Sequence, residues 1–189
     1  MSKVLVPLAG GFEEIEAVAI VDVLRRAEIE VLLASLDDNR AVQGANGITV
    51  MADMGIVDVE TETLDMIILP GGWDGTYALA DDVNVQRILK DMDKKGKNIA
   101  AICAAPFALN KAGVLKQNYT CYPSVQEQIR EDGYQGDKSM IVEDENIMTS
   151  RGPGTAICFA LAIVKKLKGQ EVYEMLRYGL LAEFCEEIK

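Results

Sequence analysis

Residues 98–106 read NIAAICAAP, and this stretch decides the fold. After Asn98, residues 99–102 are all apolar, which is typical of a strand buried on both faces of a parallel sheet. The residues after Cys103 favour a helix start, because Pro106 in a first helical turn needs no amide hydrogen-bond partner. The stretch therefore predicts a strand, a sharp turn at Cys103 and a helix.

The same alternation of short apolar runs and helical spacing continues along the chain, which predicts βαβ units and a mostly parallel sheet. The helical stretch 13–27 opens with two acids and closes with two arginines, as a helix dipole favours. Predicted strands cover 3–8, 29–34, 65–69 and 98–102, with a hairpin over 139–149. Predicted helices cover 13–27, 83–95, 105–112, 155–167 and 171–181.

Composition predicts one folded domain over residues 1–189, with 49% hydrophobic and 26% charged residues. The net charge of −11 repels nucleic-acid phosphates and anionic membranes, so we expect neither as a partner. The N-terminal apolar run is too short for a signal peptide. The four cysteines show no C-x-x-C spacing, and a domain of this size needs no disulfides, which predicts a reducing, cytoplasmic location.

The chain contains no histidine. A Ser-His-Asp or Cys-His triad within one chain is therefore excluded, and no imidazole is available as a general base or metal ligand. Only dispersed thiols and carboxylates remain as metal ligands, so we expect no metal and no cofactor.

Three predicted strands are followed by unusual residues. These are the glycines and acids of 9–14, the Pro-Gly-Gly of 70–72 and the turn of 103–106. Because ligands bind beyond the carboxyl ends of strands in an open α/β sheet, we expect the three segments to meet at one rim.

Cys103 is the candidate nucleophile at this rim. A thiol facing a helix N-terminus can have its pKa lowered from about 8.5 to about 3.5–7.5. Gly71 and Gly72 would present amides to an oxyanion formed there. The alternatives are a small buried apolar side chain at Cys103 and an ordinary tight turn at the glycines.

A carboxyl group from the first helix is the candidate partner of the thiol. Glu13 and Glu16 share a helix face, and the sequence pattern does not choose between them. A buried carboxyl favours its protonated form and would donate a hydrogen bond to a thiolate or an oxidised sulfur. The loop before the helix at 155 carries Arg151 and is either an anion site or a capping loop. Cys121, Cys158 and Cys185 are interpreted as core residues.

Four motifs together resemble the ThiJ/PfpI superfamily, most closely the branch with the parkinsonism-associated deglycase and the bacterial ThiJ-like proteins. They are GFEEIEAVAIVDVLRRA (11–27), LPGGW (69–73), AICAAP (101–106) and TSRGPGT (149–155). Each is weak alone, but their joint occurrence in this order is specific. The resemblance runs from about residue 3 to about residue 181.

The resemblance implies a flavodoxin-like three-layer sandwich of the class I glutamine amidotransferase type, with a nucleophile elbow, and a homodimer. It assigns catalytic roles to Cys103 and Glu16. It assigns oxyanion or substrate binding to Gly71, Gly72, the Ala104 amide, Arg151 and Asp22.

One position departs from the family pattern. Many members place a histidine before a proline near the cysteine, and here the pair is Tyr122-Pro123. A phenol is a poor base at neutral pH, so protease activity is not expected. Glyoxalase III or protein deglycase chemistry remains open, because a thiolate adds to an aldehyde without an imidazole.

Three functions remain as hypotheses. The first is a cysteine-dependent stress-protection protein that acts on small aldehydes or glycated protein adducts. The second is a peroxide-sensing redox or chaperone protein in which Cys103 is oxidised to the sulfinate. The third is a non-catalytic scaffold that keeps the shape of the pocket.

Overall fold

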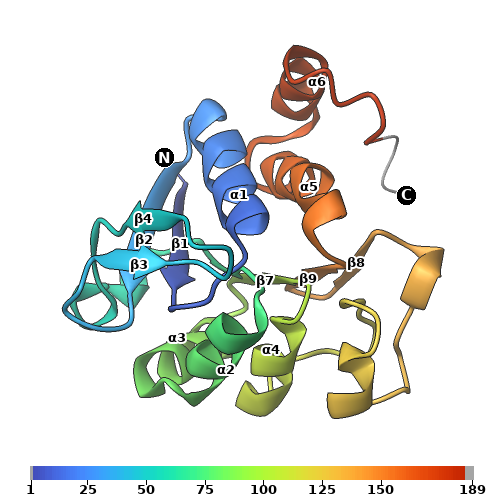
Figure 1. Cartoon of the computed structure of the whole chain (residues 1–189). Coiled ribbons are helices and arrows are strands. Elements are labelled where there is room, and N and C mark those ends of the chain that lie inside the picture. Colours follow the sequence, from blue (N-terminus) through green and yellow to red (C-terminus); the bar gives the residue numbers. More distant parts are fainter. Residues whose placement is uncertain (1, 186–189) are drawn as a thin grey trace.

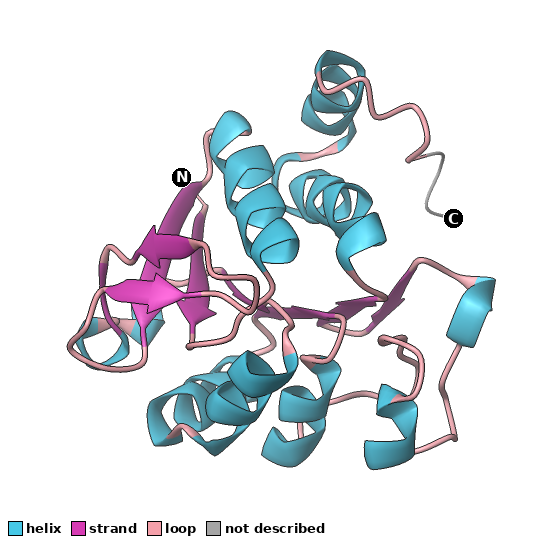
Figure 2. Ribbon diagram, viewed as in Figure 1, coloured by secondary structure: helices cyan, strands magenta, loops and turns pink. Residues whose placement is uncertain are grey.

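The computed structural model describes residues 2–185, which contain a seven-stranded sheet with helices on both faces (Figures 1 and 2). The strand order is β5-β2-β1-β6-β7-β9-β8, and only the β8–β9 pair is antiparallel. The series β2-β1-β6-β7-β9 reproduces the flavodoxin-like order 2-1-3-4-5. This confirms the predicted three-layer, mostly parallel α/β sandwich.

The elements are short and follow one another closely. The strands of the sheet are β1 (Lys3–Leu8), β2 (Glu30–Ser35), β5 (Met54–Gly55), β6 (Met66–Leu69), β7 (Asn98–Ile102), β8 (Ile141–Asp144) and β9 (Ile147–Ser150). A separate antiparallel ribbon consists of β3 (Ala41–Gln43) and β4 (Thr49–Met51). The α-helices are α1 (Glu14–Arg26), α2 (Trp73–Asp81), α3 (Val83–Lys94), α4 (Pro106–Ala112), α5 (Ala156–Lys168) and α6 (Gln170–Gly179), and η3 (Val125–Gln128) is a 3-10 turn. Within the described residues, no helix combines the length and apolar character needed to cross a bilayer.

Two apolar layers hold the sandwich together. Helices α1 and α5 cover one face of the sheet, and α2, α3 and α4 cover the other (Figure 1). Along β1, Val4 and Val6 belong to the first layer and Leu5 to the second. Both faces of the strand are therefore buried, which explains why residues 4–8 are apolar at successive positions rather than at alternate ones.

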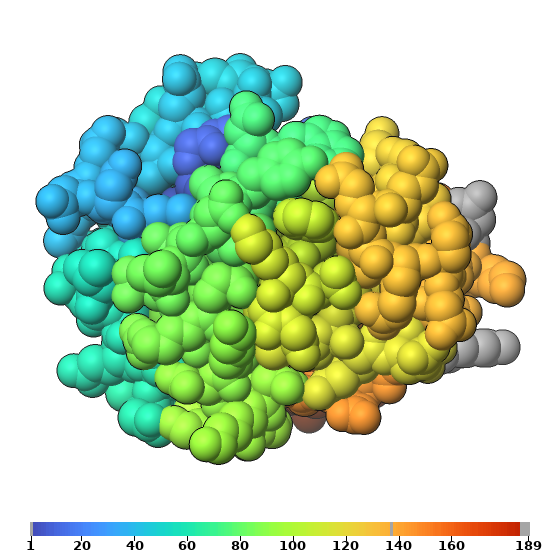
Figure 3. Space-filling view, turned by 90° about the horizontal axis from the view of Figure 1, so that it is seen from below, coloured from blue at the N-terminus to red at the C-terminus, as the bar shows by residue number. Residues whose placement is uncertain are grey.

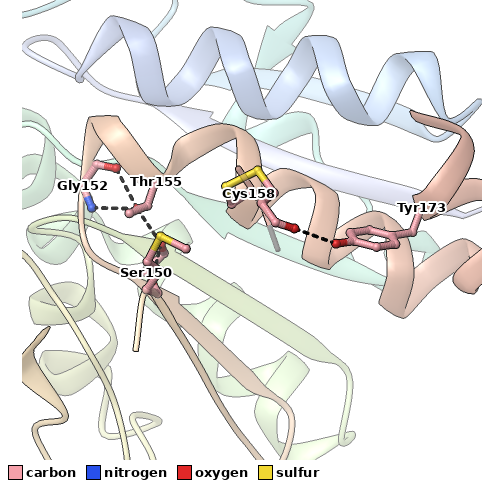
Figure 4. The surroundings of a disulfide bond; sticks show 7 residues. Ser150, Gly152, Thr155, Cys158 and Tyr173 are labelled. Carbon is pink, nitrogen blue, oxygen red and sulfur yellow. Dashed lines mark hydrogen bonds between the residues drawn. A yellow bond between two sulfur atoms is a disulfide. The ribbon is translucent and has the colours of Figure 1, made fainter. Parts of the chain in front are cut away.

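A disulfide joins Cys158 of α5 to Cys185, 27 residues further along the chain (Figure 4). Both residues are buried, and the Tyr173 hydroxyl of α6 donates a hydrogen bond to the Cys185 carbonyl at 3.0 Å. The interpretation of these cysteines as core residues is confirmed, but their pairing was not predicted, because a domain that needs no disulfide can still bring two thiols together. The cysteine-based argument for a reducing compartment loses its support.

Candidate functional site

The predicted meeting of three strand ends is confirmed at the carboxyl edge of the sheet. The Glu13 amide, in the segment after β1, donates a hydrogen bond to the Gly71 carbonyl after β6 at 2.9 Å. Gly71 in turn lies against Cys103, the residue that follows β7. Three segments that are far apart in sequence therefore surround one sulfur atom.

Cys103 occupies the sharp turn that the sequence predicts. Its φ of 64° is left-handed, a conformation that a residue with a Cβ adopts only where its surroundings enforce it. Two backbone hydrogen bonds fix it: its amide donates to Ser150 O at 3.0 Å, and its carbonyl accepts from the Tyr122 amide at 2.8 Å. Helix α4 begins three residues later at Pro106, and the side chain keeps 9% of its surface exposed.

Gly71 and Gly72 let the backbone approach the sulfur closely. A Cβ on Gly71 would lie 2.6 Å from the Cys103 Cβ, and one on Gly72 would lie 2.2 Å from the Gly11 carbonyl oxygen. The Gly72 and Ala104 amides hydrogen-bond to the sulfur, which is the arrangement predicted for an oxyanion cradle. The Gly71 amide instead donates to Glu16 Oε2 at 2.7 Å, so it orients the carboxyl group.

The structure places Glu16, rather than Glu13, beside the thiol. Glu13 is the N-cap of α1, and its carboxylate accepts a hydrogen bond from the Glu16 amide at 2.8 Å. Glu16 is fully buried and hydrogen-bonds to Cys103 through its side chain. Burial raises the pKa of Glu16 to about 7, against the lowering effect of its hydrogen bonds with Gly71 and Cys103. Both protonation states of Glu16 are therefore populated near neutral pH.

The expectation of a lowered thiol pKa was wrong. Burial raises the pKa of Cys103 well above its ordinary value, and the charge and hydrogen bond of Glu16 raise it further. The Ala104 and Gly72 amides act in the opposite direction but do not compensate. Because the carboxyl and thiol titrate as a coupled pair, a thiolate forms here when Glu16 holds the proton.

Tyr122 and Arg151 belong to segments whose backbone meets Cys103, because the Tyr122 amide and the carbonyl of Ser150, which precedes Arg151, both hydrogen-bond to its backbone. Together with Pro123 and the loop 152–155 they line a hollow of about 260 Å³. The positive charge of Arg151 acts on the buried Cys121 thiol, where it opposes a rise in pKa caused mainly by burial. Tyr122 is 46% exposed and borders this hollow.

Asp22 is not brought to the thiol site. It pairs with Arg26 at 2.8 Å on the outer face of α1, and both side chains are about half exposed. It lines a different hollow, of about 300 Å³, with Val18 and Met51 among the other lining residues. Its predicted substrate-binding role has no geometric support here.

Sequence reasoning did not single out Glu14, which the structure buries. Its carboxylate accepts hydrogen bonds from the Asn46 amide at 2.6 Å, the Asn46 side chain at 3.0 Å and the Ile48 amide at 3.3 Å. It therefore fixes the turn between β3 and β4 beside α1, a long-range role that no local pattern signals.

Among the described residues, no three His, Cys, Asp or Glu side chains gather as metal ligands.

Comparisons with known proteins identify a matching family and several similar proteins. A model described as the DJ-1/PfpI family matches residues 2–166. Protein dj-1beta of Drosophila melanogaster is 40% identical over 186 residues, covering 97% of this chain and 100% of the relative. Glutathione-independent glyoxalase DJR-1.2 of Caenorhabditis elegans is 38% identical over 159 residues, covering 84% of each. The solved structure of oxidized DJ-1 from Toxoplasma gondii has a TM-score of 0.88 and 39% identity, covering 96% of this chain and 98% of that one.

Proposed function

Because the chain belongs to the DJ-1/PfpI family, we propose that it is a stress-protection protein that converts reactive carbonyls through Cys103. The observation that carries the proposal is the buried Glu16–Cys103 pair with a carboxyl pKa of about 7, facing the Gly72 and Ala104 amides. The glyoxalase named among the relatives supports small aldehydes as substrates. Glycated protein adducts are the second substrate class.

The first step is the addition of sulfur to the aldehyde carbon. The thiol proton passes from Sγ to the Glu16 carboxylate while a sulfur lone pair forms the C–S bond. The carbonyl π electrons move to oxygen, and the Gly72 and Ala104 amides stabilise the resulting oxyanion. Protonation of that oxygen by Glu16 gives a hemithioacetal and restores the carboxylate.

The later steps need no external oxidant. In a 2-oxoaldehyde such as methylglyoxal, the Glu16 carboxylate takes the C–H proton of the former aldehyde carbon and delivers it to the neighbouring ketone oxygen, giving an enediol. Protonation of the former ketone carbon, with loss of the hydroxyl proton from the sulfur-bearing carbon to Glu16, gives a thioester. The former aldehyde carbon is thereby oxidised and the former ketone carbon reduced. Water then cleaves the C–S bond, releasing lactate and the thiol.

The test is the conversion of methylglyoxal to lactate by the wild type, Cys103→Ser and Cys121→Ser. The second variant is the matched control, because Cys121 is the other free, buried cysteine of the described chain. We expect turnover by the wild type and the control, and loss of more than a hundredfold in Cys103→Ser. Equal lactate formation by all three proteins would refute the proposal.

Peroxide sensing is the second candidate, and the protonated form of Glu16 favours it. Oxidation of the Cys103 sulfur by two equivalents of peroxide adds two oxygens and releases water, giving a sulfinate. Its oxygens would accept hydrogen bonds from the Glu16 carboxylic acid and from the Gly72 and Ala104 amides. Intact mass after limited peroxide treatment should show a two-oxygen gain in the wild type and none in Cys103→Ser. No gain in either protein would remove this candidate.

We also propose that a second copy of the chain covers the outer face of α1. Ile15, Val18 and Met51 are each at least half exposed there, and the hollow between α1 and β4 opens on the same face. A face that carries both protruding side chains and a hollow suits a two-fold interface, in which one patch contacts its own copy. Light scattering should show a dimer that Val18→Glu separates and Tyr178→Glu, on the exposed surface of α6, does not. A monomeric wild type would refute it.

The cytoplasmic location remains a proposal, and the Cys158–Cys185 pair provides its measurement. A reducing cytoplasm would keep both thiols free, although their positions allow the disulfide. Thiol trapping in fresh cell extracts should find the pair reduced. A fully oxidised pair would instead place the protein in an oxidising compartment.

A further inference from the structure

The C-terminal segment, defined here as residues 170–185, lies outside the three-layer sandwich. It consists of α6 and the residues that follow it, and α6 packs on the outer side of α5, away from the sheet (Figure 1). Figure 3 shows the opposite face of the molecule, which α2, α3 and α4 cover. The C-terminal segment therefore depends on α5 for its position, and it can move without disturbing the helices of that opposite face.

Few side chains of the C-terminal segment are fully buried. Within α6, which the structure describes in full, Tyr173 is the one buried residue, and Ala182 and Cys185 are buried after it. Four large apolar side chains of the segment are each at least 61% exposed: Met175, Tyr178, Leu181 and Phe184. Regions with few buried apolar contacts open locally at a low cost in free energy. Noncovalent packing alone therefore holds this segment weakly.

The disulfide between Cys158 and Cys185 attaches the C-terminal segment covalently to α5. Cys158 lies in the first turn of α5, directly after a hydrogen-bonded loop (Figure 4). In that loop the Thr155 hydroxyl accepts a hydrogen bond from the Gly152 amide at 3.2 Å and lies 2.7 Å from the Ser150 hydroxyl. These contacts make Cys158 the stationary half of the pair. Cys185 is at the far end of the segment, so opening of the segment carries it away from its partner.

Noncovalent contacts return Cys185 to the same place each time the segment closes. The Tyr173 hydroxyl donates a buried hydrogen bond to the Cys185 carbonyl at 3.0 Å. The Lys165 ammonium of α5 lies 5.6 Å from the centre of the Tyr173 ring, which anchors this side chain to α5. Two reacting groups that are held together in this way react far more readily than the same groups in solution. Closure of the reduced segment therefore favours the disulfide.

Exchange of the disulfide requires the open segment, because Cys158 is 1% exposed and Cys185 is fully buried in the closed one. In the open, reduced protein, one thiol loses its proton to solvent, attacks glutathione disulfide and releases one glutathione thiolate, giving a mixed disulfide. The second thiol, also deprotonated, attacks the protein sulfur of that mixed disulfide and releases the second glutathione. The two cysteines lose two electrons, which glutathione disulfide gains, and the released thiolates take up two protons. The reverse exchange reduces the pair.

We propose that Cys158 and Cys185 form a second redox site, at which a reversible disulfide latches the C-terminal segment onto α5. This site is separate from the chemistry of Cys103 and does not rest on the proposed function. In the reduced form the segment opens and closes, and in the oxidised form the disulfide keeps it closed.

A redox titration tests the site. The folded Cys103→Ser variant, in which three of the four cysteines remain, is equilibrated in buffers with different ratios of glutathione to glutathione disulfide. Alkylation in denaturant then counts the free thiols, and peptide mass spectrometry locates them. Three thiols should be free in reducing buffers and only Cys121 in oxidising ones, with the same midpoint from either starting state. A pair that stays free, or stays bonded, at every ratio would overturn the redox site.

Hydrogen exchange followed by mass spectrometry tests the latch. The amides of residues 170–185 should exchange about ten- to a hundredfold faster in the reduced protein than in the oxidised one, while those of β7 stay protected in both. The double variant Cys158→Ser/Cys185→Ser should exchange like the reduced wild type in either buffer. Cys121→Ser is the matched control and should keep the redox response. Equal exchange of the segment in both redox states, or loss of protection throughout the chain together, would overturn the latch.

Discussion

Replacement of Glu16 by glutamine should make the protein more stable at alkaline pH. Glu16 is fully buried, and burial raises its pKa to about 7. Glutamine has nearly the same shape and cannot ionise, and its side-chain oxygen can still accept the hydrogen bond that the Gly71 amide donates at 2.7 Å. The variant therefore removes the cost of a buried charge and keeps the main contact of the side chain.

The size of the effect follows from two pKa values. The unfolded carboxyl titrates at its ordinary value of 4.5 and the native one at about 7, so the native state binds more protons between these pH values. The contribution of Glu16 is fully present below about pH 4.5 and is lost as pH rises through about 7. At about 1.4 kcal/mol for each pH unit, the loss is about 3 kcal/mol. The advantage of Glu16→Gln over the wild type should grow by that amount between about pH 4 and about pH 8.

Urea unfolding at a series of pH values measures this difference. The other titrating groups are common to both proteins, so subtracting the two free energies of unfolding isolates Glu16. Glu171→Gln is the control, because Glu171 is exposed in α6 and its variant reports the general effect of replacing a surface carboxylate by an amide. A flat difference between wild type and Glu16→Gln across this range would show that Glu16 does not ionise at a cost in the native protein.

Serine in place of Cys158 should lower the free energy of unfolding by about 3 to 4 kcal/mol, because its disulfide with Cys185 links positions 27 residues apart. Reduced wild type should match the variant in urea, and wild-type stability that is insensitive to reductant would argue against this role. Gly71→Ala should cost about 1–3 kcal/mol in thermal or urea unfolding, since its Cβ would lie 2.6 Å from the Cys103 Cβ; unchanged stability would contradict the close approach. In Glu16→Gln, alkylation of Cys103 followed by mass spectrometry should reach half its maximal rate at a lower pH than in wild type, because the Glu16 charge and hydrogen bond raise the thiol pKa. A shift to higher pH would be inconsistent with that cause.

The local sequence pattern was sufficient to predict the conformation of a segment that is buried on both faces of the sheet. Strand β7 and the turn at Cys103 could be predicted because an apolar run followed by Ala-Ala-Pro leaves few other conformations. Strand β1 occupies residues 3–8, as its apolar pattern predicted. The meeting of three strand ends at one edge of the sheet was also predictable, because parallel strands bring their carboxyl ends together.

Helix α2 escaped prediction because Gly75, inside it, reads as a helix breaker. The structure supplies the reason for this glycine: a Cβ there would lie 2.9 Å from the Phe12 amide nitrogen, in the segment after β1. A close contact between distant segments therefore overrides local propensity. The ribbon of β3 and β4 escaped because strands of three residues are too short to show a period.

The sign of the thiol pKa shift was beyond sequence reasoning for a related cause. The N-terminus of α4 was visible in the pattern around Pro106 and favours a thiolate at Cys103. The burial of that thiol and the inward direction of Glu16 are properties of the packed molecule, and both oppose the thiolate. Where a helix terminus competes with desolvation and a neighbouring carboxylate, the two tertiary effects outweigh the local one.

The two proposed functions require opposite protonation states of Glu16, so their pH dependence distinguishes them. Addition of sulfur to a carbonyl requires Glu16 as a carboxylate that accepts the thiol proton, so turnover should rise as pH increases through about 7. A sulfinate at Cys103 requires Glu16 as a carboxylic acid that donates a hydrogen bond, so the oxidised protein should gain stability over the reduced one as pH falls. Both quantities can be measured on the same preparation, by lactate formation and by urea unfolding before and after peroxide treatment. If both increased with pH, the carboxyl and the sulfur would not share the proton on which each proposal depends.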